Sequence, residues 1–290
     1  MIKSFLEQIG ETLSQNDMPE YAFISQPNHP LPNVDSIKEL MNLTKSIIFP
    51  GFFGNIGNSN ATVDNLQCVY SLLNEQIYKS LCFSSNYDCP HKSADEFTLL
   101  FIKKLPEIKR LLATDVKAVH DCDPAAKSYS EVIFCYPAVQ AMLHYRVAHE
   151  LLLMQIPLLP RIITEMAHFA TGIDIHPCAQ IGEYFSIDHG TGVVIGETCI
   201  IGNNVRLYQG VTLGAKSFAF DTNGLPINLP RHPVIEDNVI IYSNSTVLGR
   251  ITIGHDSIIG GNVWQVNNVP PYSRIVQKKA SAIFTDGLGI

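Results

Sequence analysis

The sequence predicts an α+β protein, in which an N-terminal all-helical domain precedes a parallel β-helix of hexapeptide repeats. Up to about residue 170, apolar residues recur at intervals of three and four, as in helices with one buried face. Beyond it they recur every six positions, and 13 of the 19 glycines lie between residues 171 and 270. We therefore expect a helical domain at 1–170, a β-helix at 171–275 and a short flexible tail at 276–290.

The bulk composition excludes several classes of protein. The chain has 290 residues, and its 46% hydrophobic and 16% charged residues argue against disorder. Its formal charge of −7 argues against a nucleic-acid partner. Its most apolar stretch, residues 151–160, is shorter than the ~20 residues that cross a bilayer. The seven cysteines form no CxxC pair, so we expect reduced thiols and no zinc site. Together these features predict a soluble, cytoplasmic protein with no membrane partner.

Apolar periodicity and capping signals predict six helices in the first domain. The fourth begins with a capping box at Ser93–Glu96 and is expected to end near Pro106. Pro137 suits the first turn of the fifth helix, because proline lacks only an N–H that has no helical partner there. The predicted helices cover residues 2–13, 35–49, 63–77, 93–106, 137–156 and 161–169. Their apolar stripes indicate packing rather than chemistry.

A six-residue repeat runs through the second half. A helix cannot use this period, because its apolar face recurs at about 3.6 residues. A unit of one short strand and one turn instead predicts a solenoid of triangular cross-section with four to five coils, in which glycines take the corners. A β-sandwich with this spacing by chance is the alternative, and twelve positions in three registers argue against it. They are Ile175, Ile181, Ile187, Ile195, Ile201, Leu207, Leu213, Ile235, Ile241, Val247, Ile253 and Ile259.

Two interruptions of the repeat carry the candidate catalytic residues. The sequence slips by two residues at 188–192, and residues 215–231 form an extruded loop. His189 lies in the slip between an acid and a glycine, and a histidine there can take a proton from a nucleophile near pH 7. Asp174, fifteen positions upstream, could orient its ring. A histidine that merely occupies a turn remains the alternative.

Charged residues elsewhere have two interpretations each. Arg231 and His232 close the extruded loop, where a guanidinium suits a carboxylate of either a substrate or a salt-bridge partner. Asp123 lies near a helix end in the first domain. It is either a solvated helix terminus or part of the site.

The motifs at these positions resemble those of the serine O-acetyltransferases, which are left-handed β-helix hexapeptide acyltransferases. The resemblance runs from about residue 120 to residue 275 and implies that the β-helix is left-handed. The helical first domain also fits the family. The segments that carry the resemblance are 123–125 (Asp-Pro-Ala), 172–177 (Gly-Ile-Asp-Ile-His-Pro), 187–197, which includes Asp-His-Gly-Thr-Gly, 209–214 (Gln-Gly-Val-Thr-Leu-Gly), 231–233 (Arg-His-Pro) and 269–271 (Val-Pro-Pro).

This resemblance implies a role for each candidate residue. His189 would remove the hydroxyl proton of L-serine as serine attacks the acetyl-CoA thioester, and Asp174 would orient His189. Two acids would hold the serine ammonium, and two basic residues its carboxylate. No metal is expected. The implied serine-binding residues are Asp123, Asp188, Arg231 and His232, and those facing coenzyme A are Gly214, Ala215, Ser243 and Gly261.

The resemblance also implies an assembly and a protein partner. Relatives form homotrimers with active sites between neighbouring solenoids, and many pair these trimers into hexamers. Their acidic, glycine-bearing tails commonly end in isoleucine and enter the active site of O-acetylserine sulfhydrylase, so Ile290 is the expected anchor. One departure is the loop at 216–230, which is longer than the glycine-rich loop common in the family.

Other functions of a hexapeptide-repeat protein fit the candidate site residues less well. Another hexapeptide acyltransferase could act on a sugar or a different amino acid, but a sugar has no zwitterion for Arg231 and Asp123 to hold. A non-catalytic scaffold that regulates the sulfhydrylase would not need Asp174 and His189. A β-helical metalloenzyme of the carbonic anhydrase kind needs a cluster of three histidines, which is absent from the sequence.

Overall fold

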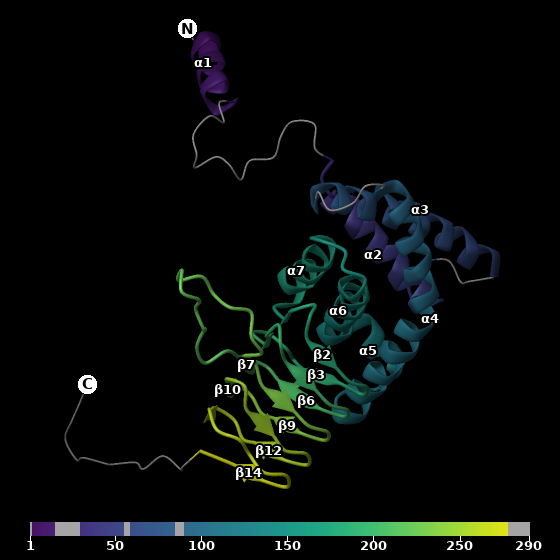
Figure 1. Ribbon diagram of the computed structural model, residues 1–290. Helices are drawn as coiled ribbons and strands as arrows, with labels where there is room; N and C mark the ends of the chain where they lie inside the picture. Colours follow the sequence, from purple (N-terminus) through teal and green to yellow (C-terminus); the bar gives the residue numbers. More distant parts are fainter. Residues whose placement is uncertain (1, 15–29, 55–58, 85–89, 278–290) are drawn as a thin grey trace.

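The structure is a computed structural model that describes residues 2–14, 30–54, 59–84 and 90–277. Within these ranges seven helices precede a stack of short parallel strands, which confirms the predicted fold (Figure 1). Ile290 lies outside the described residues. The helices are α1 (Ile2–Ser14), α2 (Val34–Ile48), α3 (Ser59–Ser84), α4 (Pro90–Cys122), α5 (Tyr129–Cys135), α6 (Pro137–Leu153) and α7 (Leu159–Thr171).

The helix predictions are confirmed except around Pro106. We expected the fourth helix to end there, but α4 continues through Pro106 to Cys122. Pro106 is exposed, whereas Leu105 and Ile108 beside it are buried. Packing on both sides of the proline therefore holds the helix together despite the lost hydrogen bond. The short helix α5 was not predicted.

Three parallel sheets form the sides of the β-helix. Their orders are β1-β4-β7-β10-β13, β11-β8-β5-β2 and β14-β12-β9-β6-β3, called here sheets A, B and C. The repeated apolar residues face the axis, and eleven of the twelve are buried. The strands are β1 (Asp174–Ile175), β2 (Gln180–Ile181), β3 (Ser186–Asp188), β4 (Val194–Ile195), β5 (Ile200–Ile201), β6 (Arg206–Tyr208), β7 (Thr212–Gly214), β8 (Val234–Ile235), β9 (Ile240–Ile241), β10 (Thr246–Leu248), β11 (Thr252–Ile253), β12 (Ile258–Ile259), β13 (Trp264–Gln265) and β14 (Arg274–Ile275).

The strand register locates both interruptions. Ile195 pairs with Leu213, 18 positions on, which is one coil of three hexapeptides. Ile175 pairs with Ile195, 20 positions on, because the turn at 188–192 holds two extra residues. Leu213 pairs with Val247, 34 positions on, because residues 215–231 leave the wall between β7 and β8 as a projecting loop (Figure 1). Both predicted interruptions are confirmed.

At the corner between sheets B and C, glycine permits close packing of the coils, and asparagine or aspartate takes the left-handed backbone conformation. A Cβ on Gly202 would lie 2.9 Å from the backbone nitrogen of Asp237 in the next coil, so glycine is needed for close approach. The left-handed backbone falls two residues later, at Asn204, Asn238 and Asp256, with φ of 56–61°. Asparagine and aspartate tolerate this conformation better than most residues.

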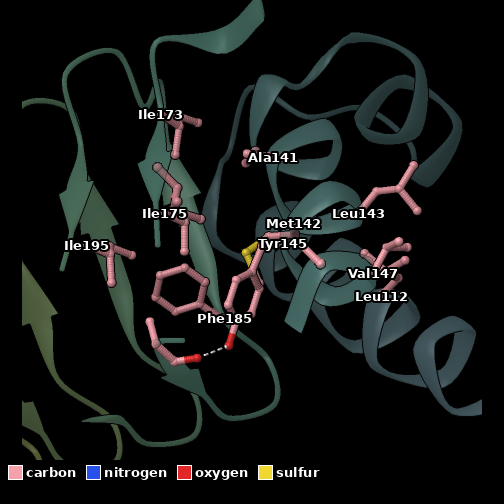
Figure 2. Close-up of a cluster of buried hydrophobic side chains, with 14 of the residues drawn as sticks. Leu112, Ala141, Met142, Leu143, Tyr145, Val147, Ile173, Ile175, Phe185 and Ile195 are labelled. Carbon is pink, nitrogen blue, oxygen red and sulfur yellow. Dashed lines mark hydrogen bonds between the residues drawn. The ribbon is translucent and has the colours of Figure 1, made fainter. Parts of the chain in front are cut away.

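Helix α6 joins the helical part of the chain to the first coil. Figure 2 shows Tyr145 and Met142 facing Phe185 and Ile175, and the Tyr145 hydroxyl donates to the Ala179 carbonyl at 2.6 Å. One continuous cluster of buried side chains runs from the helices into the β-helix. Consequently α6 and the first coil are held in a fixed relation.

A buried ion pair reinforces this junction. Arg146 on α6 contacts Asp115 on α4 through two hydrogen bonds of 2.7 and 2.9 Å, and both side chains are at most 5% exposed. Arg146 also donates to the Gly182 carbonyl at 2.8 Å, and Asp115 accepts the Phe185 N–H at 3.2 Å. The pair therefore satisfies backbone groups of the first coil, which has no preceding coil to bond.

Two sequence-based exclusions can be compared with the described part of the chain. None of its helices combines the length and apolar character needed to cross a membrane. The six cysteines in this part are free thiols.

Replacing Asp115 with asparagine should destabilise the protein strongly. The substitution leaves the Arg146 guanidinium buried without a counter-charge, which typically costs about 3–5 kcal/mol of unfolding free energy. Urea denaturation followed by circular dichroism measures the loss. Lys117→Ala on the same helix is the control, because its ion pair with Asp121 is exposed and is worth about 0–1 kcal/mol. Equal losses in both variants would contradict the assigned role of the buried pair.

Candidate active site

His189 stands on the turn between β3 and β4. The backbone of the turn has positive φ at His189 (56°), Gly190 (97°) and Gly192 (78°). A Cβ on Gly190 would lie 2.5 Å from the Ile173 side chain, so only glycine lets the turn pack on the core. The His189 side chain is 73% exposed. The insertion therefore projects an imidazole from a rigid corner.

Asp174, predicted to orient His189, begins β1 next to this turn. Its N–H donates to the Val193 carbonyl at 2.9 Å. In the described chain its carboxylate is not within 4.0 Å of a His189 ring nitrogen. The acid that approaches the ring is Asp188, whose Oδ1 is 3.8 Å from Nε2. The single chain thus pairs His189 with Asp188 and leaves Asp174 on the neighbouring strand.

Asp123 lies just beyond the end of α4 and joins the same corner. It accepts hydrogen bonds from the Tyr136 hydroxyl at 2.5 Å and from the Ala125 N–H at 2.8 Å. These bonds lower the pKa of Asp123, and the bond to Asp123 raises the pKa of Tyr136 to about 12. Asp123, Tyr136 and Asp188 also line a cavity of about 10 Å³, room for about one water. Two carboxylates therefore converge beside His189.

Arg231 lies at a different corner, where the extruded loop returns to β8. Its Nη2 contacts the Glu197 carboxylate at 2.5 Å, and its Nη1 donates to Asn228 at 3.1 Å. Its Nε is buried and has no acceptor among the described residues. Glu197 and Asn228 therefore hold the guanidinium in place.

Thr198 determines the tautomer of His232, and the surroundings keep the ring neutral. The Thr198 N–H donates to the His232 Nδ1 at 3.1 Å, which places the ring proton on Nε2. The Thr198 hydroxyl accepts the N–H groups of Arg231 and His232 at 2.9 and 3.0 Å. Burial and the charge of Arg231 lower the pKa of His232 to about 4. The imidazole is therefore neutral at pH 7 and presents an N–H donor.

The predicted site residues thus form two groups in one chain. Asp123, Asp188 and His189 lie at the corner between sheets C and A, whereas Arg231 and His232 lie at the corner between sheets A and B. Sheet A separates the two corners. Among the described residues, no hydrogen bond or ion pair joins the two groups.

The residues expected to face coenzyme A divide in the same way. Gly214 ends β7, and Ala215 follows it at the corner between sheets A and B. Ser243 and Gly261 stack at the corner between sheets C and A, where a Cβ on Gly261 would lie 3.3 Å from the Ser243 carbonyl oxygen. At the corner between sheets C and A, the backbones of successive coils therefore approach each other closely beside polar side chains.

Three residues at these corners were not assigned from the sequence. Glu197 and Thr198 hold Arg231 and His232, and Tyr136 holds Asp123. Glu197 and Thr198 occupy the corner directly after β4, so their position in the repeat could have marked them as candidate site residues. Tyr136 lies 13 positions from Asp123, and no motif in the sequence connects the two.

One side-chain group in the described part of the chain has metal-ligand spacing. Donor atoms of Glu165, His168 and Asp174 lie within 4.8 Å of one another. Glu165, however, already contacts Arg161 and lies 3.3 Å from His168. We interpret this group as an ion-pair network beside Asp174 and assign it no metal.

Comparison with known proteins shows which family this chain resembles. A family model described as bacterial transferase hexapeptide (six repeats) matches residues 232–264. The chain is 46% identical to a serine acetyltransferase of Synechococcus elongatus, over 98% of this chain and 95% of the relative. It is 44% identical to serine acetyltransferase of Bacillus subtilis, over 61% of this chain and 78% of the relative.

Solved structures agree with the sequence relatives. Serine acetyltransferase 1 of Entamoeba histolytica in complex with L-cysteine has a TM-score of 0.75 at 35% identity, covering 92% of this chain and 94% of that chain. A serine acetyltransferase in complex with CoA has a TM-score of 0.54 at 26% identity, covering 83% and 97%. Because the similarity extends over nearly the whole sequence, the chain belongs to the serine acetyltransferase family.

Proposed function

We propose that the protein transfers the acetyl group of acetyl-CoA to the hydroxyl of L-serine, giving O-acetylserine and free CoA. The observation that carries the proposal is the turn at 188–192, where His189 stands exposed beside Asp188 and within electrostatic reach of Asp123. The names of the relatives and the solved family complexes with L-cysteine, serine and CoA support the same reaction.

His189 is the proposed general base. It accepts the serine hydroxyl proton while the serine oxygen bonds to the thioester carbonyl carbon. The carbon–sulfur bond then breaks, and His189 returns the proton to the leaving CoA sulfur. Asp174 is proposed to orient the ring, as the family resemblance implies, and Asp188 is the carboxylate nearest to it in the single chain.

Charge complementarity supports serine over a sugar as acceptor. Asp123 remains ionised at neutral pH because its pKa is lowered, so Asp123 and Asp188 suit the serine ammonium. The guanidinium of Arg231 and the Nε2–H of His232 suit its carboxylate. A sugar would leave both charged groups without partners, which is costly in a closed site.

A homotrimer would bring the two groups together. The acidic group and the basic group lie at opposite edges of sheet A, so each corner of a single chain carries half of a site. A three-fold arrangement in which one corner meets the other corner of the next copy completes three equal sites. Acetyl-CoA would lie in the same crevice, between Gly214 and Ala215 of one copy and Ser243 and Gly261 of its neighbour.

Four further expectations belong to this proposal. The domains are proposed to divide at residues 170 and 275. The location is proposed to be cytoplasmic, and trimers can pair into hexamers. O-acetylserine sulfhydrylase is the proposed protein partner, with Ile290 as its anchor.

Replacing His189 with alanine should reduce the rate of acetyl transfer by roughly 10²–10⁴-fold, the usual loss for a general base. Release of free thiol from acetyl-CoA in the presence of serine measures it. His255→Ala is the control, because His255 also lies on the β-helix but pairs with Asp256 away from the site. Full activity in His189→Ala would disprove the mechanism, and no serine-dependent thiol release by the unmodified protein would disprove the function.

Co-expressing two inactive variants should restore activity if neighbouring copies share each site. His189→Ala and Arg231→Ala lose different halves, so co-expression should give trimers in which about one quarter of the sites are intact, by random assortment of copies. Thiol release by the co-purified mixture measures the recovery. Mixing the separately purified variants without subunit exchange is the control. Absence of recovery in co-expressed trimers would place both residues in one copy's site.

The buried His232 should make stability fall in mild acid. Its pKa is about 4 in the folded protein and about 6.5 when unfolded, so only the unfolded chain binds this proton between these values. Its contribution to the unfolding free energy is therefore complete above pH 6.5 and is lost as pH falls towards 4. Urea midpoints at pH 7 and pH 5 should show a larger loss for the unmodified protein than for His232→Gln. Equal losses would mean that His232 is not held neutral.

A further inference from the structure

Arg206 is a cation beside the acidic residues Asp123 and Asp188, and the proposed reaction does not use it. It begins β6 on sheet C, where it pairs with Ser186 of β3. Helix α4 packs against β3, so its end covers this part of the sheet. Arg206 therefore lies between the wall of the β-helix and the point where the chain leaves α4.

The guanidinium of Arg206 holds the backbone next to Asp123. Its Nη1 donates to the Cys122 carbonyl at 3.3 Å and to the Tyr208 hydroxyl at 3.5 Å. Cys122 is the last residue of α4, and the carbonyl end of a helix carries a partial negative charge that favours a cation. Asp123 is the next residue along the chain. Arg206 thus fixes the segment from which this carboxylate projects.

A small cavity connects Arg206 with both carboxylates. Arg206, Asp123, Tyr136 and Asp188 all line it, and its volume of about 10 Å³ is room for about one water. In the described part of the chain, no carboxylate oxygen lies within 4.0 Å of the guanidinium. The cation therefore faces the two acids across the cavity and forms no direct ion pair with either.

The Nε–H of Arg206 is the second sign of a connection across the cavity. This donor is buried and has no acceptor among the described residues. A buried donor without an acceptor is unfavourable, so such a group usually marks a bound water or ion. One water in the cavity can accept this N–H and donate to the carboxylates of Asp123 and Asp188, which gives it three polar partners.

We propose that Arg206 is a positioning residue for the serine ammonium, an inference that rests on the proposed function. It holds Asp123 through the Cys122 carbonyl and links both carboxylates through one water. Two like charges that line one cavity repel each other, and the cation offsets this repulsion. Arg206 itself does not touch serine. Its loss should therefore weaken the binding of serine and leave the rate of the transfer step unchanged.

Substitution of Arg206 tests this role. Arg206→Gln should raise the KM for L-serine by roughly 10-fold, the effect of one charged hydrogen bond, and leave kcat and the KM for acetyl-CoA unchanged. Arg206→Lys keeps the charge but loses the Nε–H, so its KM should lie between those of the unmodified protein and Arg206→Gln. Arg274→Gln is the matched control. Arg274 occupies the same position on sheet C three coils later, at the edge opposite β3.

An acceptor analogue separates the acidic residues from the rest of the site. 3-Hydroxypropanoate is serine without its amino group, so it makes no demand on Asp123 and Asp188. Its inhibition constant as a competitor of serine should be the same in Arg206→Gln and in the unmodified protein. Equal weakening of serine and 3-hydroxypropanoate would mean that Arg206 supports the whole site, and would overturn the inference.

The remaining outcomes are equally decisive. An unchanged KM for serine together with a lower urea midpoint would show that Arg206 only caps α4, and a lower KM would show that it repels the ammonium. Either result overturns the inference. If Arg206→Gln does not fold, Arg206→Lys takes its place, and the absence of any rise in its KM for serine overturns the inference as well.

Failure of the proposed function can be distinguished from failure of this inference. If the unmodified protein releases no thiol from acetyl-CoA with serine, the function is wrong, and calorimetric titration with L-serine replaces the kinetics. Weaker serine binding by Arg206→Gln than by Arg274→Gln would then still support the positioning role. Equal binding by the two variants would count against it.

Discussion

The buried ion pair between Asp115 and Arg146 is the contact on which the arrangement of the site depends. A β-helix has an open edge at its first coil, whose backbone groups find no strand to bond. Arg146 and Asp115 satisfy two of these groups, and Tyr145 a third. Because Asp115 belongs to α4, the same contact sets the position of the end of that helix. Asp123 lies one residue beyond that end and is thereby held beside Asp188.

Because the β-helix is otherwise regular, its two interruptions are the places where functional side chains project from the wall. Most of the wall is Ile and Val facing a narrow axis, with outward side chains that offer little chemistry. Two extra residues at 188–192 are enough to project His189, because the rest of the coil cannot deform to absorb them. The loop at 215–231 similarly delivers Arg231 and His232 to the next corner, where Thr198 and Glu197 fix them. A rigid scaffold thus positions each of the two groups from which the proposed site is built.

Sequence periodicity was sufficient for the fold because the axial residues of a β-helix are local and repetitive. The twelve apolar positions, the slip and the loop were all correctly placed, and so were most of the helices. Pro106 was misread because a long helix with buried neighbours tolerates a proline that local rules treat as a stop. Helix α5 was missed because seven residues are too few to show a helical period.

The sequence by itself determined the repeat, the interruptions and the residue types available for chemistry, since all of these are encoded in spacing along the chain. Only the tertiary structure decided how those residues are grouped. It placed Asp188 rather than Asp174 nearest His189, bonded Tyr136 to Asp123, and buried His232 as a neutral ring whose proton Thr198 places on Nε2. It also placed Arg206 in one cavity with Asp123 and Asp188. Apart from the adjacent Asp188 and His189, these relations join residues at least 13 positions apart in the sequence, and no spacing rule connects them.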